Sequence, residues 1–142
     1  MTLFIAPATL QQIIHHGEAA YPDEGAGLVL GVNTGGNRLV TKLVMLDNTR
    51  EVADRHNRYL LTPEDFQRGE TEAANLGVEV LGVFHSHPDH PNQPSEFDRE
   101  WALPVLSYII TRVEAGKAAG NRSWRLSEDR TGFDEETIEV LS

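Results

Sequence analysis

The chain contains no cysteine among its 142 residues. A disulfide, a thiolate metal ligand and a cysteine nucleophile are therefore all excluded. Basic side chains are also scarce, because 12 lysines and arginines stand against 22 acidic residues, for a formal net charge of -10. A protein that binds nucleic-acid phosphates or anionic lipid needs a basic face, so the sequence predicts no nucleic acid and no membrane as partner.

Long apolar runs are absent as well. The longest, at residues 28–32, is far shorter than the roughly 20 residues that cross a bilayer. Residues 1–5 lack the positive charge and the apolar length of a secretory signal, which predicts a cytoplasmic protein. The composition, 39% hydrophobic and 24% charged, is that of an ordinary globular protein, and the length predicts one domain over residues 1–142.

Helix and strand signals follow one another along the chain. Apolar residues at helical spacing after Pro7 predict a helix that ends at Tyr21-Pro22. Thr62 as cap, Pro63 at the first position and Gly77 as stop predict a second helix over residues 63–76. A short third helix should begin at Ser95 and finish near residue 103. Strands are predicted at residues 26–32, 39–46, 78–85, 107–113, 123–126 and 137–141. This order predicts an α/β fold, with a mixed sheet flanked by helices.

The most informative segment is His85-Ser86-His87-Pro88, followed by Ser95-Glu96-Phe97-Asp98. Two histidines two residues apart project from the same face of a strand, so both imidazoles can bind one ion. A carboxylate from just downstream would complete three ligands of types that suit zinc and leave the fourth tetrahedral position open, as in catalytic zinc sites. Two imidazoles and a carboxylate also suit ferrous iron.

Ser95-x-x-Asp98 is also a helix-capping pattern, and we expect the two roles of Asp98 to compete. The histidines just upstream favour the ligand role. His90, in the loop between the two parts of the segment, is predicted to lie at the rim of the site.

The segment resembles the JAMM (MPN+) metalloprotease motif, and Tyr21-Pro22-x-Glu24 before an apolar strand is similar to the part of that family that holds its glutamate. The resemblance implies the MPN (cytidine-deaminase-like) fold and Zn²⁺ bound by His85, His87 and Asp98. It further implies Glu24 as general acid/base and Ser95 as a hydrogen-bond donor at the reacting carbonyl. Glu18 and Asp23 are nearby rivals of Glu24, which stands closest to the strand.

Within the family, the chain looks like the small prokaryotic members that act on sulfur-carrier proteins. The implied function is hydrolysis of a peptide or isopeptide bond after the Gly-Gly tail of a ubiquitin-like or sulfur-carrier protein. Those members often have two cysteines after the glutamate, where this chain has Gly25-Ala26. The alternative is a non-catalytic MPN-type scaffold or protein-binding module. RadC proteins share a similar motif, but they would carry an additional helical region.

Overall fold

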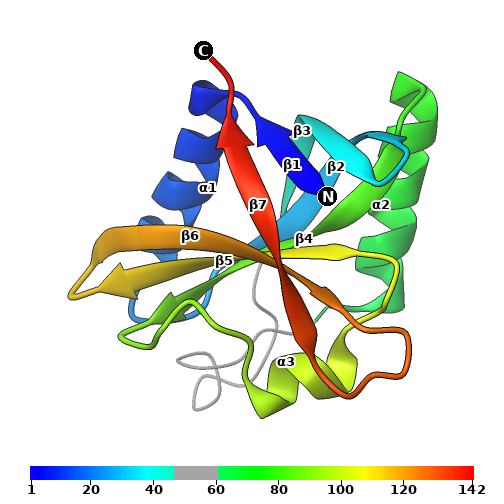
Figure 1. Ribbon diagram of the computed structural model, residues 1–142. Helices are drawn as coiled ribbons and strands as arrows, with labels where there is room; N and C mark the ends of the chain where they lie inside the picture. The colour runs from blue at the N-terminus through cyan, green and yellow to red at the C-terminus, as the bar shows by residue number, and fades with distance from the viewer. Residues whose placement is uncertain (47–60) are drawn as a thin grey trace.

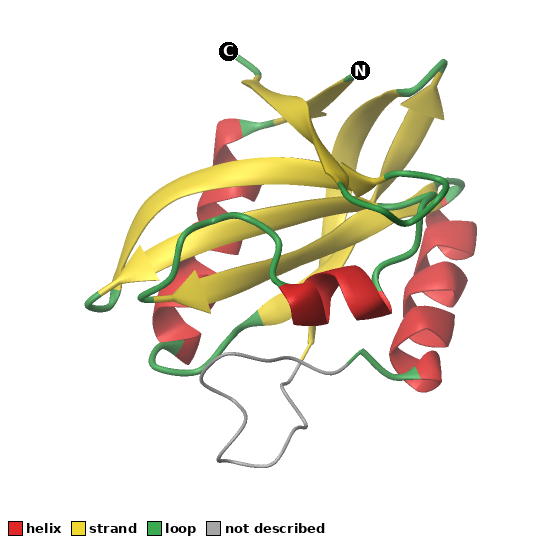
Figure 2. Ribbon diagram, turned by 60° about the horizontal axis from the view of Figure 1, so that its bottom comes forward, coloured by secondary structure: helices red, strands yellow, loops and turns green. Residues whose placement is uncertain are grey.

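The computed structural model describes residues 1–46 and 61–142. Its seven strands are β1 (Thr2–Ile5), β2 (Ala26–Thr34), β3 (Asn37–Leu46), β4 (Glu79–Pro88), β5 (Ser107–Glu114), β6 (Lys117–Leu126) and β7 (Phe133–Val140). The helices are α1 (Pro7–Ala20), α2 (Pro63–Leu76) and α3 (Glu96–Trp101). Both views place α1 and α2 on opposite sides of the sheet, with α3 at the end away from the two termini (Figures 1 and 2). No described helix is long and apolar enough to cross a bilayer.

The sheet is mixed, as predicted, and it closes into a barrel in the order β1-β3-β2-β4-β5-β6-β7. β1 pairs in parallel with both β3 and β7, and β4 pairs in parallel with β5. The remaining pairs are antiparallel. The sequence did not predict β1, the short strand that closes the barrel.

Local signals explain why the helices begin and end where they do. Thr62 and Asp65 form a capping box at the start of α2, with Pro63 in the first turn. Gly77 ends the helix in the left-handed conformation (φ 70°), which glycine adopts without the Cβ clash of other residues. The predicted bounds of α1 and α2 are confirmed, whereas α3 ends at Trp101, before the predicted end near residue 103.

The apolar core lies on both faces of the central strands. Leu28 and Leu30 of β2 belong to a cluster that includes Ala73 of α2, whereas Val29, between them, packs with Ile13 of α1. This alternation follows from the two-residue period of a strand. A sheet covered by a helix on each face fixes β2 and β4 firmly, and these are the strands that position the candidate site.

Candidate metal centre

The two histidines lie at the carboxyl-terminal end of β4, next to the start of β2. His85 stands opposite Ala26 in the antiparallel β2–β4 pair, so Glu24, just before β2, reaches the same place. Glu24 is 2% exposed, His85 1% and His87 6%. One ligand atom from each of these residues lies within 4.8 Å of the others, and this is the only such group within residues 1–46 and 61–142. The donor set, two imidazoles and a carboxylate, fits a zinc ion.

Asp98 reaches the same histidines from α3. Its Oδ2 lies 3.2 Å from His87 Nε2, and its Oδ1 lies 3.8 Å from His85 Nε2. On the other side, Glu24 Oε1 lies 3.4 Å from His85 Nδ1. The structure therefore brings together all four of the residues predicted as ligands and acid/base, with one carboxylate on each side of His85.

The tautomer of His87 follows from its neighbours. His87 Nδ1 lies 2.7 Å from the carbonyl oxygen of Pro91, which can only accept a hydrogen bond. In neutral His87, Nδ1 is therefore the protonated nitrogen, and Nε2 has the lone pair that a metal requires. Because Nε2 faces Asp98, a metal held by His87 would lie on the side of the Asp98 carboxylate.

Burial and charge act in opposite directions at this pair. Burial disfavours both ionised forms, but the neighbouring charge of His85 and the hydrogen bond with His87 outweigh it and hold the pKa of Asp98 at about 2. Burial likewise lowers the pKa of His87, yet the hydrogen bond to Asp98 and its charge leave that pKa above the ordinary value of 6.5. In the absence of metal, the two groups thus stabilise each other as an ion pair.

Ser95 and Asp98 also cap α3, as the alternative interpretation predicted. Asp98 N donates to Ser95 Oγ (3.1 Å), and Ser95 N donates to Asp98 Oδ2 (2.8 Å). The oxygen that accepts this bond, Oδ2, also faces His87 Nε2, and Oδ1 faces His85 Nε2, so the capped carboxylate lies beside both histidines. The Ser95 side chain is exposed, and its hydroxyl proton remains available to a ligand.

The loop between β4 and α3 is hydrogen-bonded to other parts of the molecule at Asp89 and at Asn92. Asp89 accepts hydrogen bonds from the Tyr21 hydroxyl (2.5 Å) and from Ala115 N (2.9 Å). Trp124 Nε1 donates to the carbonyl of Asn92 (3.0 Å), next to the Pro91 carbonyl that fixes His87. These hydrogen bonds restrict the loop, so Ser95 and Asp98, which follow it, are positioned before any metal binds.

Ser86, between the two histidines, was not predicted as a site residue. Its side chain points to the opposite face, where Ser86 Oγ accepts a hydrogen bond from Gly25 N (2.8 Å) and Ser86 N donates to Gly25 O (2.9 Å). This pair of hydrogen bonds fixes the backbone next to Glu24. The sequence signal that could have identified Ser86 is its position, as a small polar residue between two predicted ligands on an apolar strand.

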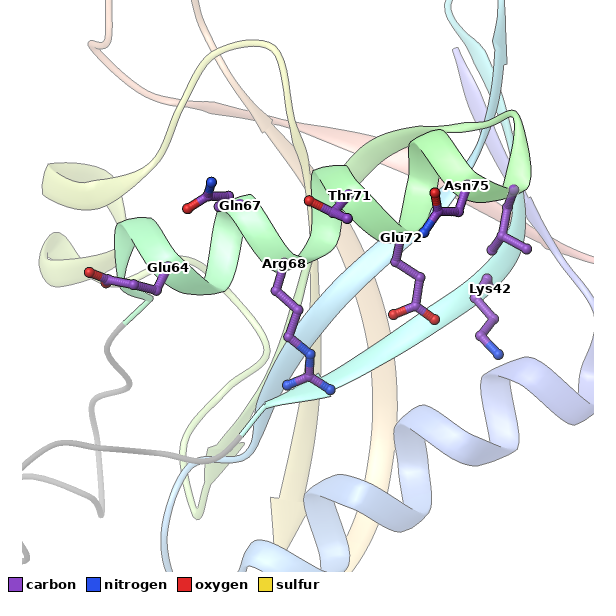
Figure 3. Close-up of a pocket in the computed structure, with 8 residues that line it drawn as sticks. Lys42, Glu64, Gln67, Arg68, Thr71, Glu72 and Asn75 are labelled. Atoms are coloured by element: carbon purple, nitrogen blue, oxygen red, sulfur yellow. The ribbon is translucent and has the colours of Figure 1, made fainter.

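Several other candidates lie outside the cluster. Glu18 accepts a hydrogen bond from Ala118 N in β6, and His90 is exposed on the loop. The cavity between α2 and β3 is lined by polar side chains of α2 together with Lys42, and Arg68 and Glu72 point toward β3 (Figure 3). None of the residues that line this cavity belongs to the buried cluster.

Comparisons with known proteins bear on the family and the fold. The family model of prokaryotic homologs of the JAB domain matches residues 6–127. A protein from Salinibacter ruber is 38% identical and aligns over 97% of this chain and 91% of its own, with a TM-score of 0.75. A protein from Desulfitobacterium hafniense is 28% identical over 99% and 93% of the two chains, with a TM-score of 0.86.

A third solved structure is described as a JAMM metalloprotease-like zinc site in the proteasome and signalosome. It is 20% identical, aligns over 100% of both chains and has a TM-score of 0.59, a likeness that shows a shared fold. No curated protein matches the chain.

Proposed function

This chain belongs to the prokaryotic homologs of the JAB domain and has the JAB/MPN fold, and we propose that it is a zinc-dependent metallopeptidase of the JAMM type. The observation that carries the proposal is the buried cluster in which the Asp98 carboxylate faces Nε2 of both histidines, with Glu24 beside them. A scaffold without activity has no need to bury these four side chains together, because burying charged groups is costly.

We assign the ligand role to His85, His87 and Asp98. The tautomer of His87 supports this assignment, since its Nε2 faces Asp98. The rival assignment makes Glu24 the third ligand, because its carboxylate also lies within reach of both histidines. Either carboxylate, that of Asp98 or that of Glu24, could be the third ligand, and substitution of each one in turn separates the two assignments.

A bound zinc ion would supply Lewis acidity and lower the pKa of water to about 7. The Glu24 carboxylate would accept a proton from the attacking water and return it to the leaving amine. The Ser95 hydroxyl would donate a hydrogen bond to the oxygen of the reacting carbonyl, where negative charge develops. The backbone that carries Glu24 is held by Ser86, so the base stays at a fixed place.

The substrate class is proposed from the family resemblance. A peptide or isopeptide bond after the Gly-Gly tail of a ubiquitin-like or sulfur-carrier protein suits a buried site. Glycines let an extended backbone approach closely where a side chain would collide with the protein. A carrier-cysteine adduct is the substrate to try first.

The test is zinc content per chain by mass spectrometry, together with cleavage of a carrier adduct, for the parent and two variants. We expect about one zinc in the parent, almost none in Asp98→Ala, and full zinc without turnover in Glu24→Gln. Loss of zinc from Glu24→Gln with retention in Asp98→Ala would make Glu24 the ligand. A parent that binds no zinc after zinc is added back would leave the binding-module alternative.

A further inference from the structure

The residue proposed as third ligand lies on a helix of only six residues. α3 comprises Glu96–Trp101, and Asp98 is at its third position. A helix this short does not hold its shape by its own hydrogen bonds, because nucleation is costly and few bonds follow it. The position of Asp98 therefore depends on whatever holds the two ends of α3. At the first end the capping box of Ser95 and Asp98 does so.

At the other end, one arginine binds the terminal carbonyls. Arg130 Nη1 donates to the carbonyl of Ala102 (2.7 Å), and Nη2 donates to the carbonyls of Arg99 and Glu100 (both 3.1 Å). The last carbonyls of a helix have no partner within the helix, and basic side chains are suited to bind them. A planar guanidinium can serve several at once, which a lysine cannot do with the same geometry.

The loop that presents Arg130 is itself held in one conformation. Asp129 Oδ1 accepts from Ser127 Oγ (2.8 Å), Thr131 N (3.1 Å) and Thr131 Oγ1 (2.7 Å), and Arg130 N donates to Ser127 O (2.9 Å). Arg130 has φ 61°, in the left-handed region that residues other than glycine rarely adopt. A non-glycine residue persists there only where its surroundings impose it.

We propose that Arg130 is a positioning residue for the metal site: it fixes α3 so that the carboxylate of Asp98 stays beside His87 and His85. The inference rests on the proposed function, because it takes Asp98 as a zinc ligand. It assigns a role in metal binding to the β6–β7 loop, which contributes no side chain to the buried cluster.

Removal of the guanidinium should weaken zinc binding without removing a ligand. Outer partners that orient ligands typically contribute 10–100-fold in metal affinity, and we expect a loss in that range for Arg130→Ala. Arg130→Lys keeps the charge but fewer of the hydrogen bonds, so its loss should be smaller. Asp129→Asn, which weakens the loop while Arg130 remains, should also bind zinc less tightly than the parent.

The control is Glu135→Gln, which weakens the bond between Glu135 on β7 and Arg122 on β6 and leaves the Arg122 guanidinium over the Trp124 ring (4.7 Å). Like the Arg130 substitutions, it removes hydrogen bonds of an arginine near the end of the chain. Neither Glu135 nor Arg122 makes the contacts with α3 that Arg130 makes. This substitution should leave zinc affinity unchanged.

Zinc affinity would be measured by competition with a chromophoric chelator, and the visible spectrum of the cobalt-substituted proteins would report ligand geometry. Weaker zinc binding and an altered cobalt spectrum in Arg130→Ala, with both unchanged in Glu135→Gln, would support the inference. A lower unfolding temperature alone, with parent-like affinity and spectrum, would overturn it. If Arg130→Ala does not fold, parent-like affinity in both Arg130→Lys and Asp129→Asn would overturn it equally.

The two proposals fail in different ways. A parent protein that binds zinc, with an Arg130→Ala variant that binds it as tightly, would overturn the positioning role and leave the proposed function intact. A parent that binds no zinc would overturn both.

Discussion

Two clusters of buried polar side chains lie toward opposite ends of β4. The first is the metal cluster described above, at His85 and His87. The second, which we call the arginine cluster, includes Arg38, Ser107, Ser123, Arg125 and Glu136. Arg38 donates to Leu81 O (3.0 Å) at the start of β4 and to Ser107 Oγ (2.7 Å).

In the arginine cluster, the one carboxylate binds both a guanidinium and a hydroxyl. Arg125 forms a salt bridge with Glu136, whose other oxygen accepts from Ser123 Oγ (2.8 Å). The same nitrogen, Arg125 Nη2, also donates to Gly36 O (2.7 Å), which connects β6 to the β2–β3 turn. Because the charged groups of this cluster bind an opposite charge and backbone carbonyls from β4 and from the β2–β3 turn, they stabilise the closed barrel.

The metal cluster has a different composition. Two carboxylates supply four acceptor oxygens, whereas the two imidazoles, in the neutral form that binds a metal, supply one N–H each, and that of His87 is directed at Pro91 O. Acceptors therefore outnumber donors, and a cation restores the balance. The difference teaches that burial and charge alone do not mark a functional site. The chemical composition of the cluster does.

The largest expected effect tests the arginine cluster. Glu136→Gln leaves Arg125 buried without its counter-charge, and breaking a buried pair in this way costs about 3–5 kcal/mol of unfolding free energy. Zinc affinity of the folded variant should be unchanged, because the metal cluster lies elsewhere. Denaturant unfolding and chelator competition would measure the two quantities.

The control for this prediction is the neighbouring residue. Glu135 forms a similar bond with Arg122, but at 46% exposure, so Glu135→Gln should change stability very little. Equal losses of unfolding free energy in Glu136→Gln and Glu135→Gln would show that the arginine cluster stabilises the fold no more than an exposed ion pair does.

The converse substitution is His87→Ala. It should lower zinc affinity by more than about 100-fold, the upper limit for residues that only orient ligands. The metal-free protein should lose less stability than Glu136→Gln does, because Asp98 keeps its hydrogen bond from Ser95 N. His90→Ala, on the exposed loop, is the control and should bind zinc normally. A larger loss of stability than in Glu136→Gln would contradict the division of roles.

The pH dependence separates the clusters further. The raised pKa of His87 gives the metal-free protein stability that is fully present below 6.5 and is lost as pH rises through that pKa. The depressed pKa of Asp98 gives stability that is present above 3.8 and lost as pH falls through about 2. The pair thus stabilises the metal-free protein most between these limits, roughly pH 4 to 6.5.

Zinc should show the opposite dependence at neutral pH. Protons compete with zinc for His87 Nε2, so zinc affinity should fall as pH drops, starting above the ordinary histidine value of 6.5. Thermal unfolding with zinc or with chelator from pH 5 to 8 would measure both trends. Asp98→Asn removes the cause of the raised pKa of His87, and a metal-free variant whose stability falls at the same pH as that of the parent would contradict the assignment.

A smaller effect is expected at Ser86, which supports the metal cluster from the other face of β4. Ser86→Ala leaves the buried Gly25 N without its acceptor, which costs about 1–3 kcal/mol. Turnover should fall more than zinc affinity does, because Glu24 shifts while the ligands stay. Steady-state kinetics and chelator competition would compare the two. Equal losses of turnover and of zinc affinity would mean that Ser86 supports the metal ligands rather than Glu24.

Local signals in the sequence were sufficient for much of the fold. Thr62, Pro63 and Gly77 fix the bounds of α2 through bonds within a few residues, and the structure confirms them. The spacing of His85 and His87 on a strand likewise depends on nothing distant. Ligand chemistry is visible in a sequence because few residue types bind metals and strand geometry dictates their spacing.

The features that sequence reasoning missed depend on contacts between distant segments. β1 is a strand because residues 2–5 pair with residues 137–140, at the other end of the chain. Arg130 reaches Ala102 from 28 residues away. Neither pattern has a local signature, since four residues are too few to show a period and an arginine in a loop has many possible partners. Positioning residues are therefore harder to predict than ligands.

The smallest expected effect concerns Gly25, where similar family members often have cysteine. A Cβ at this position would lie 3.1 Å from Ala20 Cβ, from His16 Cδ2 and from His16 O, which is closer than ordinary packing. Gly25→Ala should therefore cost about 1 kcal/mol, at the low end for overpacking, because His16 can shift by a few tenths of an ångström. His16 also contacts the Ala26 carbonyl (Nε2 to O, 3.0 Å), so that shift should disturb the backbone beside Glu24.

The matched change is Gly132→Ala, since a Cβ at Gly132 would meet no atom within 4 Å. Thermal unfolding of the two variants would measure the difference in stability, and turnover would show whether the base has moved. Turnover lowered in Gly25→Ala but not in Gly132→Ala would show that α1, through His16, helps to set the position of Glu24. Parent-like stability and turnover in Gly25→Ala would mean that the site tolerates a Cβ at this position, and Gly25 would then have no part in setting the position of Glu24.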